Sequence, residues 1–170
     1  SATSIAENAG SSLTVTATLS TATTADVTVT IGTAGTATEG TDYTDGSGVV
    51  NDITISAGST TGTVNFTPTD DSVYEGDETA TIAVSGVSGG SATESGTQSV
   101  TITISENESA PTVTLTTSAT SIAENAGSSL TLTATLSTAT TADVTVDLST
   151  SGAATEGTDY TDGSGNVDDI

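Results

Sequence analysis

The sequence contains no lysine, arginine or histidine, and its 22 aspartate and glutamate residues give it a formal net charge of −22. Nucleic acids and anionic membrane surfaces are therefore excluded as direct partners, because both are bound through basic groups that replace counterions. Side-chain salt bridges and lysine-based covalent chemistry are excluded for the same reason. Since the chain has no basic side chains, a dissolved cation must neutralise these carboxylates.

Cysteine, methionine and tryptophan are also absent, so the chain has neither disulfides nor thiolate metal sites. No apolar run approaches the length of a membrane span, and we expect no direct membrane insertion. Aromatic residues make up 2% of the chain and hydrophobic residues 32%. The core must therefore be thin and built from Val, Ile, Leu and Ala, and the arrangement of these residues decides whether the chain folds.

The chain repeats itself. Residues 4–52 recur as residues 121–169 at a constant offset of 117, without insertion or deletion and with few substitutions. This period exceeds the roughly 20 to 50 residues of solenoid and propeller repeats, so each copy can bury its own core. The predicted domains are residues 1–109, a repeat without its first strand, and residues 110–170, the N-terminal half of the next repeat. The boundary falls near Ser109–Pro111, where a proline interrupts strand pairing.

Aliphatic residues alternate with threonines in several short segments, as in antiparallel strands that bury one face. The predicted strands are residues 13–19, 27–31, 53–55, 62–67, 79–84, 100–104 and, in the second copy, 113–115. Breaks rich in Gly, Ser and Asp separate them, and no segment has a helical period. The sequence predicts an all-β fold of tandem antiparallel β-sandwiches. An isolated chain that starts at Ser1 has no counterpart of 113–115, so we expect an unpaired sheet edge beside the 13–19 strand, which the preceding segment fills in an intact array.

Acidic residues gather at the predicted strand ends. Five of the nine residues from Asp70 to Glu78 are acidic. A hard dication, which takes 6 to 8 oxygen ligands, would relieve their mutual repulsion. Alternatively, these residues are solvated turn formers, since Asp and Gly favour turns. Glu7, Asp42 and the segment from Glu106 to Glu108 are further acids at strand ends, and strand ends converge at one pole of an antiparallel sandwich.

Four motifs occur in order along the first copy. They are Glu-Asn-Ala-Gly from Glu7, Gly-Thr-Asp-Tyr from Gly40, Asp-Asp-x-x-Tyr-Glu-Gly-Asp-Glu from Asp70, and Val-Thr-Ile-Thr-Ile-Ser-Glu-Asn from Val100. Together these motifs resemble the Calx-beta domain, which occurs in sodium/calcium exchangers, in an integrin and in tandem arrays of bacterial surface and adhesion proteins. The resemblance implies a seven-stranded, immunoglobulin-like sandwich with Ca²⁺ bound by loops at one end.

The resemblance also implies metal ligands at the positions that match the family's calcium ligands. In the first copy these are Glu7, Asp42, Asp70, Asp71, Glu75, Glu106 and Glu108, with Glu78 as an additional candidate. The second copy retains Glu124 and Asp159 of this set. Ser72 replaces the third Asp of the acidic run, and Glu106-Asn107-Glu108 replaces a closing Asp triplet. Both departures lower the charge of the site and point to fewer or weaker calcium ions.

The sequence predicts a calcium-stabilised structural repeat of a large extracellular bacterial protein, such as an adhesin stalk, a spacer or a surface filament. Its partners would be neighbouring repeats of the same chain and other copies in a filament. Near-identical copies favour this hypothesis, because reach and rigidity grow with each copy. The alternative is an adhesion module that binds a glycan or matrix partner through calcium. An enzyme, such as a glycosidase with two carboxylates, is disfavoured because most acid/base and nucleophilic groups are absent.

Overall fold

The computed structural model describes residues 3–162 and divides the chain into two compact units, Ser1–Glu108 and Ser109–Ile170. The division falls one residue before the boundary expected from the sequence. The outer ends of both predicted domains, residues 1–2 and 163–170, lie outside the described residues. Within residues 3–162 no helix is long and apolar enough to cross a membrane.

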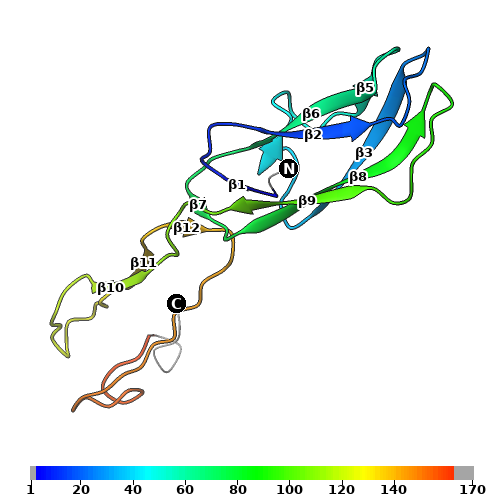
Figure 1. The fold of residues 1–170 in the computed structure, drawn as a ribbon. Helices are drawn as coiled ribbons and strands as arrows, with labels where there is room; N and C mark the ends of the chain where they lie inside the picture. Colours follow the sequence, from blue (N-terminus) through cyan, green and yellow to red (C-terminus); the bar gives the residue numbers. More distant parts are fainter. Residues whose placement is uncertain (1–2, 163–170) are drawn as a thin grey trace. The chain divides into compact units, whose positions relative to one another are not determined.

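The first unit is a β-sandwich of two sheets (Figure 1). Its strands are β1 (Ser4–Ala6), β2 (Leu13–Thr18), β3 (Val27–Gly35), β4 (Tyr43–Thr44), β5 (Ile53–Ile55), β6 (Thr61–Pro68), β7 (Val73–Tyr74), β8 (Glu78–Ser88) and β9 (Ser99–Ser105). One sheet has the order β1-β9-β8-β3-β5 and the other the order β2-β6-β4. Neighbouring strands of these sheets are antiparallel, except that β1 runs parallel to β9. The predicted sandwich is confirmed, and the parallel pair is a departure from the purely antiparallel prediction.

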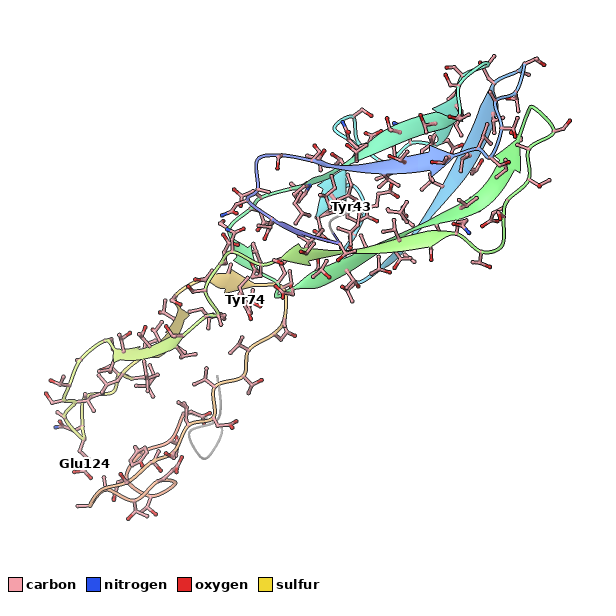
Figure 2. All side chains as sticks on the ribbon, in the orientation of Figure 1. Tyr43, Tyr74 and Glu124 are labelled. Atoms are coloured by element: carbon pink, nitrogen blue, oxygen red, sulfur yellow. The ribbon has the colours of Figure 1, made fainter. Side chains whose placement is uncertain are left out.

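Alternation along the strands builds the core between the two sheets. On β2 the three threonines are exposed, whereas Leu13, Val15 and Ala17 are half-buried. Tyr43 and Phe66 are fully buried and stack with their ring centroids 4.7 Å apart; Figure 2 shows Tyr43 between the sheets. The other buried aliphatic side chains larger than alanine are Ile5, Val27, Val29, Val50, Ile53, Ile55, Ile82, Ile102 and Ile104. A thin aliphatic core with two aromatic residues therefore holds the sheets together.

The six strands predicted for the first unit all form, and β8 is the one that differs most from its prediction. It continues to Ser88 through Gly86, inside a segment that the sequence marks as a break. The pairing with β3 shifts register between Thr30 and Ile31, which leaves Ser85 as an extra residue whose hydroxyl donates to the Thr30 carbonyl at 3.2 Å. Gly86 thus lies at a β-bulge. The short strands β1, β4 and β7 were not predicted, because two or three residues are too few to show alternation.

The second unit contains β10 (Val113–Thr117), β11 (Leu132–Leu136) and β12 (Ala139–Thr140). β10 confirms the strand predicted at 113–115, and it pairs antiparallel with β11, the counterpart of β2. Residues 144–148 correspond to residues 27–31 of β3, with Asp147 and Leu148 in place of Thr30 and Ile31, but form no strand.

Gly62 on β6 lies where β5 of the other sheet comes very close. A Cβ added at Gly62 would lie 2.5 Å from the Thr54 carbonyl oxygen and 2.9 Å from Cγ2 of Ile53. We expect Gly62→Ala to force these strands apart and to lower the free energy of unfolding by about 1–3 kcal/mol, the usual cost of overpacking. Urea unfolding at a fixed calcium concentration measures the change.

The matched control is Gly32→Ala on β3. A Cβ there would meet Cβ of Ser85 at 3.5 Å, which is an ordinary contact. We expect little change or a small gain in stability, because alanine restricts the unfolded chain more than glycine does. Equal losses from the two substitutions would contradict the close approach at Gly62.

Candidate metal centre

The acidic residues predicted as ligands in the first unit lie near the pole where β1, β6 and β9 end and β8 begins. Ala6 pairs with Ser105, so Glu7 and Glu106 leave neighbouring strands side by side, and the Glu7 N–H donates to the Ser105 carbonyl at 3.0 Å. Glu78 opens β8 opposite the end of β9. The sheet register itself therefore brings together acids that are far apart in the sequence.

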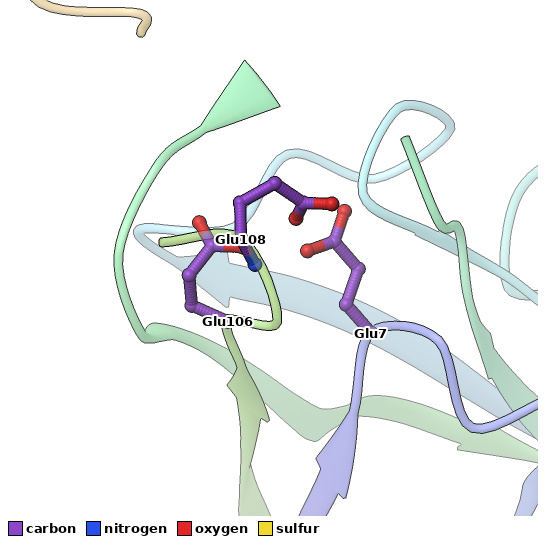
Figure 3. Close-up of side chains that lie close together, drawn as sticks. All are labelled: Glu7, Glu106 and Glu108. Atoms are coloured by element: carbon purple, nitrogen blue, oxygen red, sulfur yellow. The ribbon is translucent and has the colours of Figure 1, made fainter. Parts of the chain in front are cut away.

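The first group at this pole consists of Glu7, Glu106 and Glu108. One carboxylate oxygen from each lies within 4.8 Å of the others, and Figure 3 shows the carboxyl groups of Glu7 and Glu108 pointing toward one another. Glu7 is only 8% exposed. Oε1 of Glu108 accepts a hydrogen bond from the Asn107 side chain at 2.9 Å, whereas its Oε2 is buried and has no hydrogen-bond partner. A buried acceptor without a partner is costly, and a cation would satisfy it.

The second group consists of Asp42, Glu75 and Glu78, again with one oxygen from each within 4.8 Å of the others. All three side chains are half-buried. They come from the turn before β4, the turn after β7 and the first position of β8. Six of the eight acids predicted as ligands in the first copy thus lie in two compact groups.

Glu106 fixes the loops around both groups. Its Oε2 accepts the N–H groups of Glu75 at 2.6 Å and Gly76 at 2.8 Å, and its Oε1 accepts those of Asn107 at 2.8 Å and Glu108 at 2.9 Å. Burial acts to raise the pKa of Glu106, but the N–H donors of Glu108, Glu75 and Gly76 outweigh it and lower the pKa to about 2. Glu106 is therefore ionised at neutral pH and ties the turn after β7 to the end of β9.

The other members of the first group hold protons more tightly. Burial raises the pKa of Glu7 from 4.5 to about 7, and the charges of Glu106, Glu108 and Asp71 add to the shift. The pKa of Glu108 is also raised, first by the adjacent Glu106 carboxyl and then by burial and by nearby charge that includes Asp70. Bringing these carboxyl groups together is thus unfavourable while all of them are ionised.

The second group behaves in the same way. Burial raises the pKa of Glu78 from 4.5 to about 7, and Asp42 is the strongest of the neighbouring charges. Burial likewise raises the pKa of Glu75, followed by the charges of Asp42, Asp71 and Glu106. Because Glu106 acts on residues of both groups, the two groups form one electrostatic unit.

Asp70 and Asp71, both predicted as ligands, belong to neither group. The Asp71 N–H donates to Oε1 of Glu7 at 3.2 Å, and its own Oδ1 accepts the Val73 N–H at 2.7 Å. Asp71 therefore caps a turn, which is the alternative role considered above for the acids between Asp70 and Glu78. Its charge still contributes to the site. Asp77 was not predicted; its Oδ1 accepts the Glu106 N–H at 3.0 Å and so positions the central residue of the pole.

The second unit repeats part of this arrangement. Oδ2 of Asp159 accepts the Thr155 N–H at 2.7 Å, just as Asp42 accepts the Thr38 N–H at 2.5 Å. Glu124, the counterpart of Glu7, is exposed in the loop between β10 and β11 (Figure 2). In the described part of this unit no three acids come close enough to share an ion. The structure thus gives Glu124 and Asp159 no common site.

The donor set of the first unit fits a hard cation. Carboxylate oxygens without imidazole or thiolate groups suit Ca²⁺ rather than zinc. Ligand oxygens lie about 2.3–2.6 Å from Ca²⁺, so two of them on opposite sides of one ion are about 4.6–5.2 Å apart. The observed limit of 4.8 Å within each group therefore allows one ion to contact all three carboxylates.

Comparison with known protein families agrees with this geometry. The family model described as the Calx-beta domain matches residues 1–108 and 106–168. The chain belongs to the Calx-beta family. The two adjacent matches make it a tandem pair of Calx-beta repeats, as the sequence motifs suggested. A search of curated proteins finds no match.

One solved structure is similar to the chain, a crystal structure of CBD12 from CALX1.2. The two share 23% sequence identity with a TM-score of 0.49. The alignment covers 61% of this Calx-beta chain and 40% of that chain.

The raised pKa values should make the stability of the calcium-free chain depend on pH. Glu7 and Glu78 have pKa values of about 7 in the folded state against a usual value of 4.5. Between these values the folded state binds more protons than the unfolded state, so the free energy of unfolding should fall as the pH rises from 4.5 to 7 and level off above it. Thermal unfolding in chelator at a series of pH values measures this slope.

Glu7→Gln should flatten the slope, because the amide cannot ionise. Glu124→Gln removes the same charge at the equivalent, exposed position of the second copy and should leave the slope unchanged. If both substitutions flattened the profile equally, the pH dependence would come from the net charge of the chain and not from the acids of the pole.

Proposed function

We propose that the chain is a calcium-stabilised structural repeat of a large extracellular surface protein, acting as an adhesin stalk, a spacer or a filament subunit. The observation that carries the proposal is the group of Glu7, Glu106 and Glu108, in which a buried carboxylate oxygen has no partner. The chain has no cationic side chain that could supply one. Calcium is the common dissolved cation that accepts several carboxylates at this spacing.

The positions of the ligands support a structural role. Glu7 follows β1, Glu75 lies in the turn after β7, and Glu108 is the last residue of the first unit. An ion in the first group would hold the end of β1 to the end of β9, and an ion in the second group would hold the turn after β7 to the start of β8. Repetition then multiplies length and rigidity, which suits a stalk or filament whose partners are its own neighbouring repeats.

The expected affinity supports a location outside the cell. Each group offers three carboxylates and must take its remaining ligands from water or backbone, and its raised pKa values mean that protons compete with the metal. Sites of this kind bind weakly. Extracellular calcium modules work at dissociation constants of about 10⁻⁴–10⁻³ M, whereas cytosolic sensors need far tighter sites.

Calcium should stabilise the chain, and single ligand substitutions should remove the effect. Calcium at about 10 to 100 times its dissociation constant stabilises the folded state by roughly 1.4–2.7 kcal/mol per site. Glu108→Gln should abolish most of the calcium-dependent stabilisation that the first group contributes. Glu75→Gln should do the same for the second group, since each substitution removes a charged ligand. Melting curves in chelator and in millimolar calcium, together with calorimetric titration, measure both effects.

Asp26→Asn is the matched control. Asp26 accepts the Ala57 N–H at 2.8 Å beside the start of β3, which pairs with the far end of β8. It should keep the full calcium response. If all three variants reduced the calcium-dependent stabilisation equally, the effect would come from diffuse screening by counterions. If calcium left the melting curve of the unmodified chain unchanged, the calcium proposal would be wrong.

The spacer role can be tested separately on an array of three complete repeats. Glu106 and Glu108 immediately precede the next unit, so bound calcium should restrict the joint at residues 109–111. We expect the maximum dimension in small-angle scattering to increase when calcium is added to the chelated array. Repeats that bind calcium without any lengthening would be flexible beads, and the stiff-spacer role would have to be abandoned.

A further inference from the structure

Asp42 and Glu78 reach the second acidic group from different sheets. Asp42 immediately precedes β4, which pairs with β6, whereas Glu78 is the first residue of β8 in the five-stranded sheet. The distance between their carboxyl groups therefore depends on how residues 36–42, the segment between β3 and β4, are fixed to the five-stranded sheet. The Ala37 N–H donates to the Thr79 carbonyl at 3.0 Å, which fixes the entrance of this segment but not its far end at Asp42.

Residues 38–42 form a tight turn that presents Asp42. The Asp42 N–H donates to the Thr38 carbonyl at 2.9 Å, and the Thr38 N–H donates in return to Oδ2 of Asp42 at 2.5 Å. The Gly40 N–H donates to the Tyr43 carbonyl at 2.8 Å, and Gly40 has a φ of +85°, which glycine adopts without strain. The turn thus fixes the Asp42 carboxylate relative to its own backbone.

The second unit contains the same turn at residues 155–159. The Asp159 N–H donates to the Thr155 carbonyl at 2.7 Å, and the Gly157 N–H donates to the Tyr160 carbonyl at 2.9 Å. The turn forms although residues 144–148 form no strand and no three described acids of this unit come together. The segment Thr-Glu-Gly-Thr-Asp-Tyr therefore encodes the turn by itself, and a separate contact must fix the turn to the sandwich.

Glu39 supplies this contact in the first unit. Its Oε2 accepts the Thr33 hydroxyl at 3.0 Å, and its Oε1 accepts the Val50 N–H at 2.6 Å, so the turn is held from two sides. Thr33 lies on β3 opposite Ile82 of β8, the strand that begins at Glu78. The hydrogen bond to Thr33 therefore ties the Asp42 turn to the sheet that carries the other strand-borne acid of the group.

The second copy keeps the same contact. The Thr150 hydroxyl, at the position equivalent to Thr33, donates to Oε2 of Glu156 at 2.7 Å. Four of the nine residues that correspond to β3 differ between the copies, whereas the threonine and the whole turn sequence are identical. Among the described residues Glu39 belongs to neither group of acids that could share an ion. Its carboxylate is thus engaged in holding the turn.

We infer that Glu39 is a positioning residue of the second group: it binds no ion itself, and its two hydrogen bonds hold Asp42 where the carboxylate can share an ion with Glu75 and Glu78. The inference rests on the calcium function proposed above. Groups that orient a metal ligand without touching the metal change the affinity about 10- to 100-fold when they are replaced.

Calorimetric titration of two variants measures each group by itself. Glu108→Gln lacks a ligand of the first group, and in this background Glu39→Ala should weaken calcium binding by the second group about tenfold. Glu75→Gln lacks a ligand of the second group, and in this background Glu39→Ala should leave the affinity of the first group unchanged. A general loss of structure would weaken both groups, so the contrast between the backgrounds separates positioning from stability.

Glu39→Gln tests whether Glu39 acts through its hydrogen bonds or its charge. The amide oxygen can accept the Val50 N–H, and the amide NH₂ can donate to the Thr33 hydroxyl, so this variant should keep the affinity of the second group within about twofold. Thr33→Val retains the side-chain shape and removes one donor. It should weaken the second group about threefold, and it tests the contact even if Glu39→Ala does not fold.

Asp45→Ala is the matched control. Asp45 lies three residues after Asp42, as Glu39 lies three residues before it, and its Oδ1 accepts the Ser47 N–H at 2.8 Å within its own loop. Its loss removes the same charge and should change the affinity of the second group little. Equal weakening by Asp45→Ala and Glu39→Ala, or by Glu39→Gln and Glu39→Ala, would refute the positioning role and leave the calcium proposal intact. If the unmodified chain bound no calcium, both would fail.

Discussion

Carboxylates must find partners in a chain that has no cationic side chain, and the rest of the structure depends on how they do so. Away from the pole the partners include backbone N–H groups. Asp26 accepts the Ala57 N–H at 2.8 Å and Asp52 accepts the Ile31 N–H at 2.9 Å, so these two acids tie together segments that are distant in the sequence. At the pole the acids outnumber such donors: Glu106 takes four of them, and Oε2 of Glu108 has none. Among the described residues of the first unit, the acids that crowd together are therefore confined to one end of the sandwich.

The core determines which acids meet. Ile5 and Ile104 are buried, and each lies two residues before an acid of the first group, so burial of these side chains leaves Glu7 little freedom to move away from Glu106. Buried Tyr43 performs the same role for Asp42, next to it in the sequence. The thin core thus also determines the geometry of the acidic pole, because the free energy gained from apolar burial partly offsets the repulsion between the carboxylates that it brings together.

The sequence predicted those parts of the fold that depend on local alternation. The strands at β2, β3, β6 and β9 show period two over enough residues to be visible, and the motif order led to Glu7 and Asp42. It could not predict that Glu106 would accept four N–H groups or that Asp71 would cap a turn, because both depend on loop conformation. It also missed the path of β8 through Gly86, since a bulge is visible only once the partner strand is known.

One requirement of the first unit points outside it. Its pole gathers carboxyl groups from four strand ends, and the chain has no cationic side chain that could balance their charge. A dissolved ion that binds the folded state alone stabilises it in proportion to its concentration and can be removed again. The loops at the pole therefore differ from the rest of the sandwich, because their stability depends on the solution as well as on the sequence.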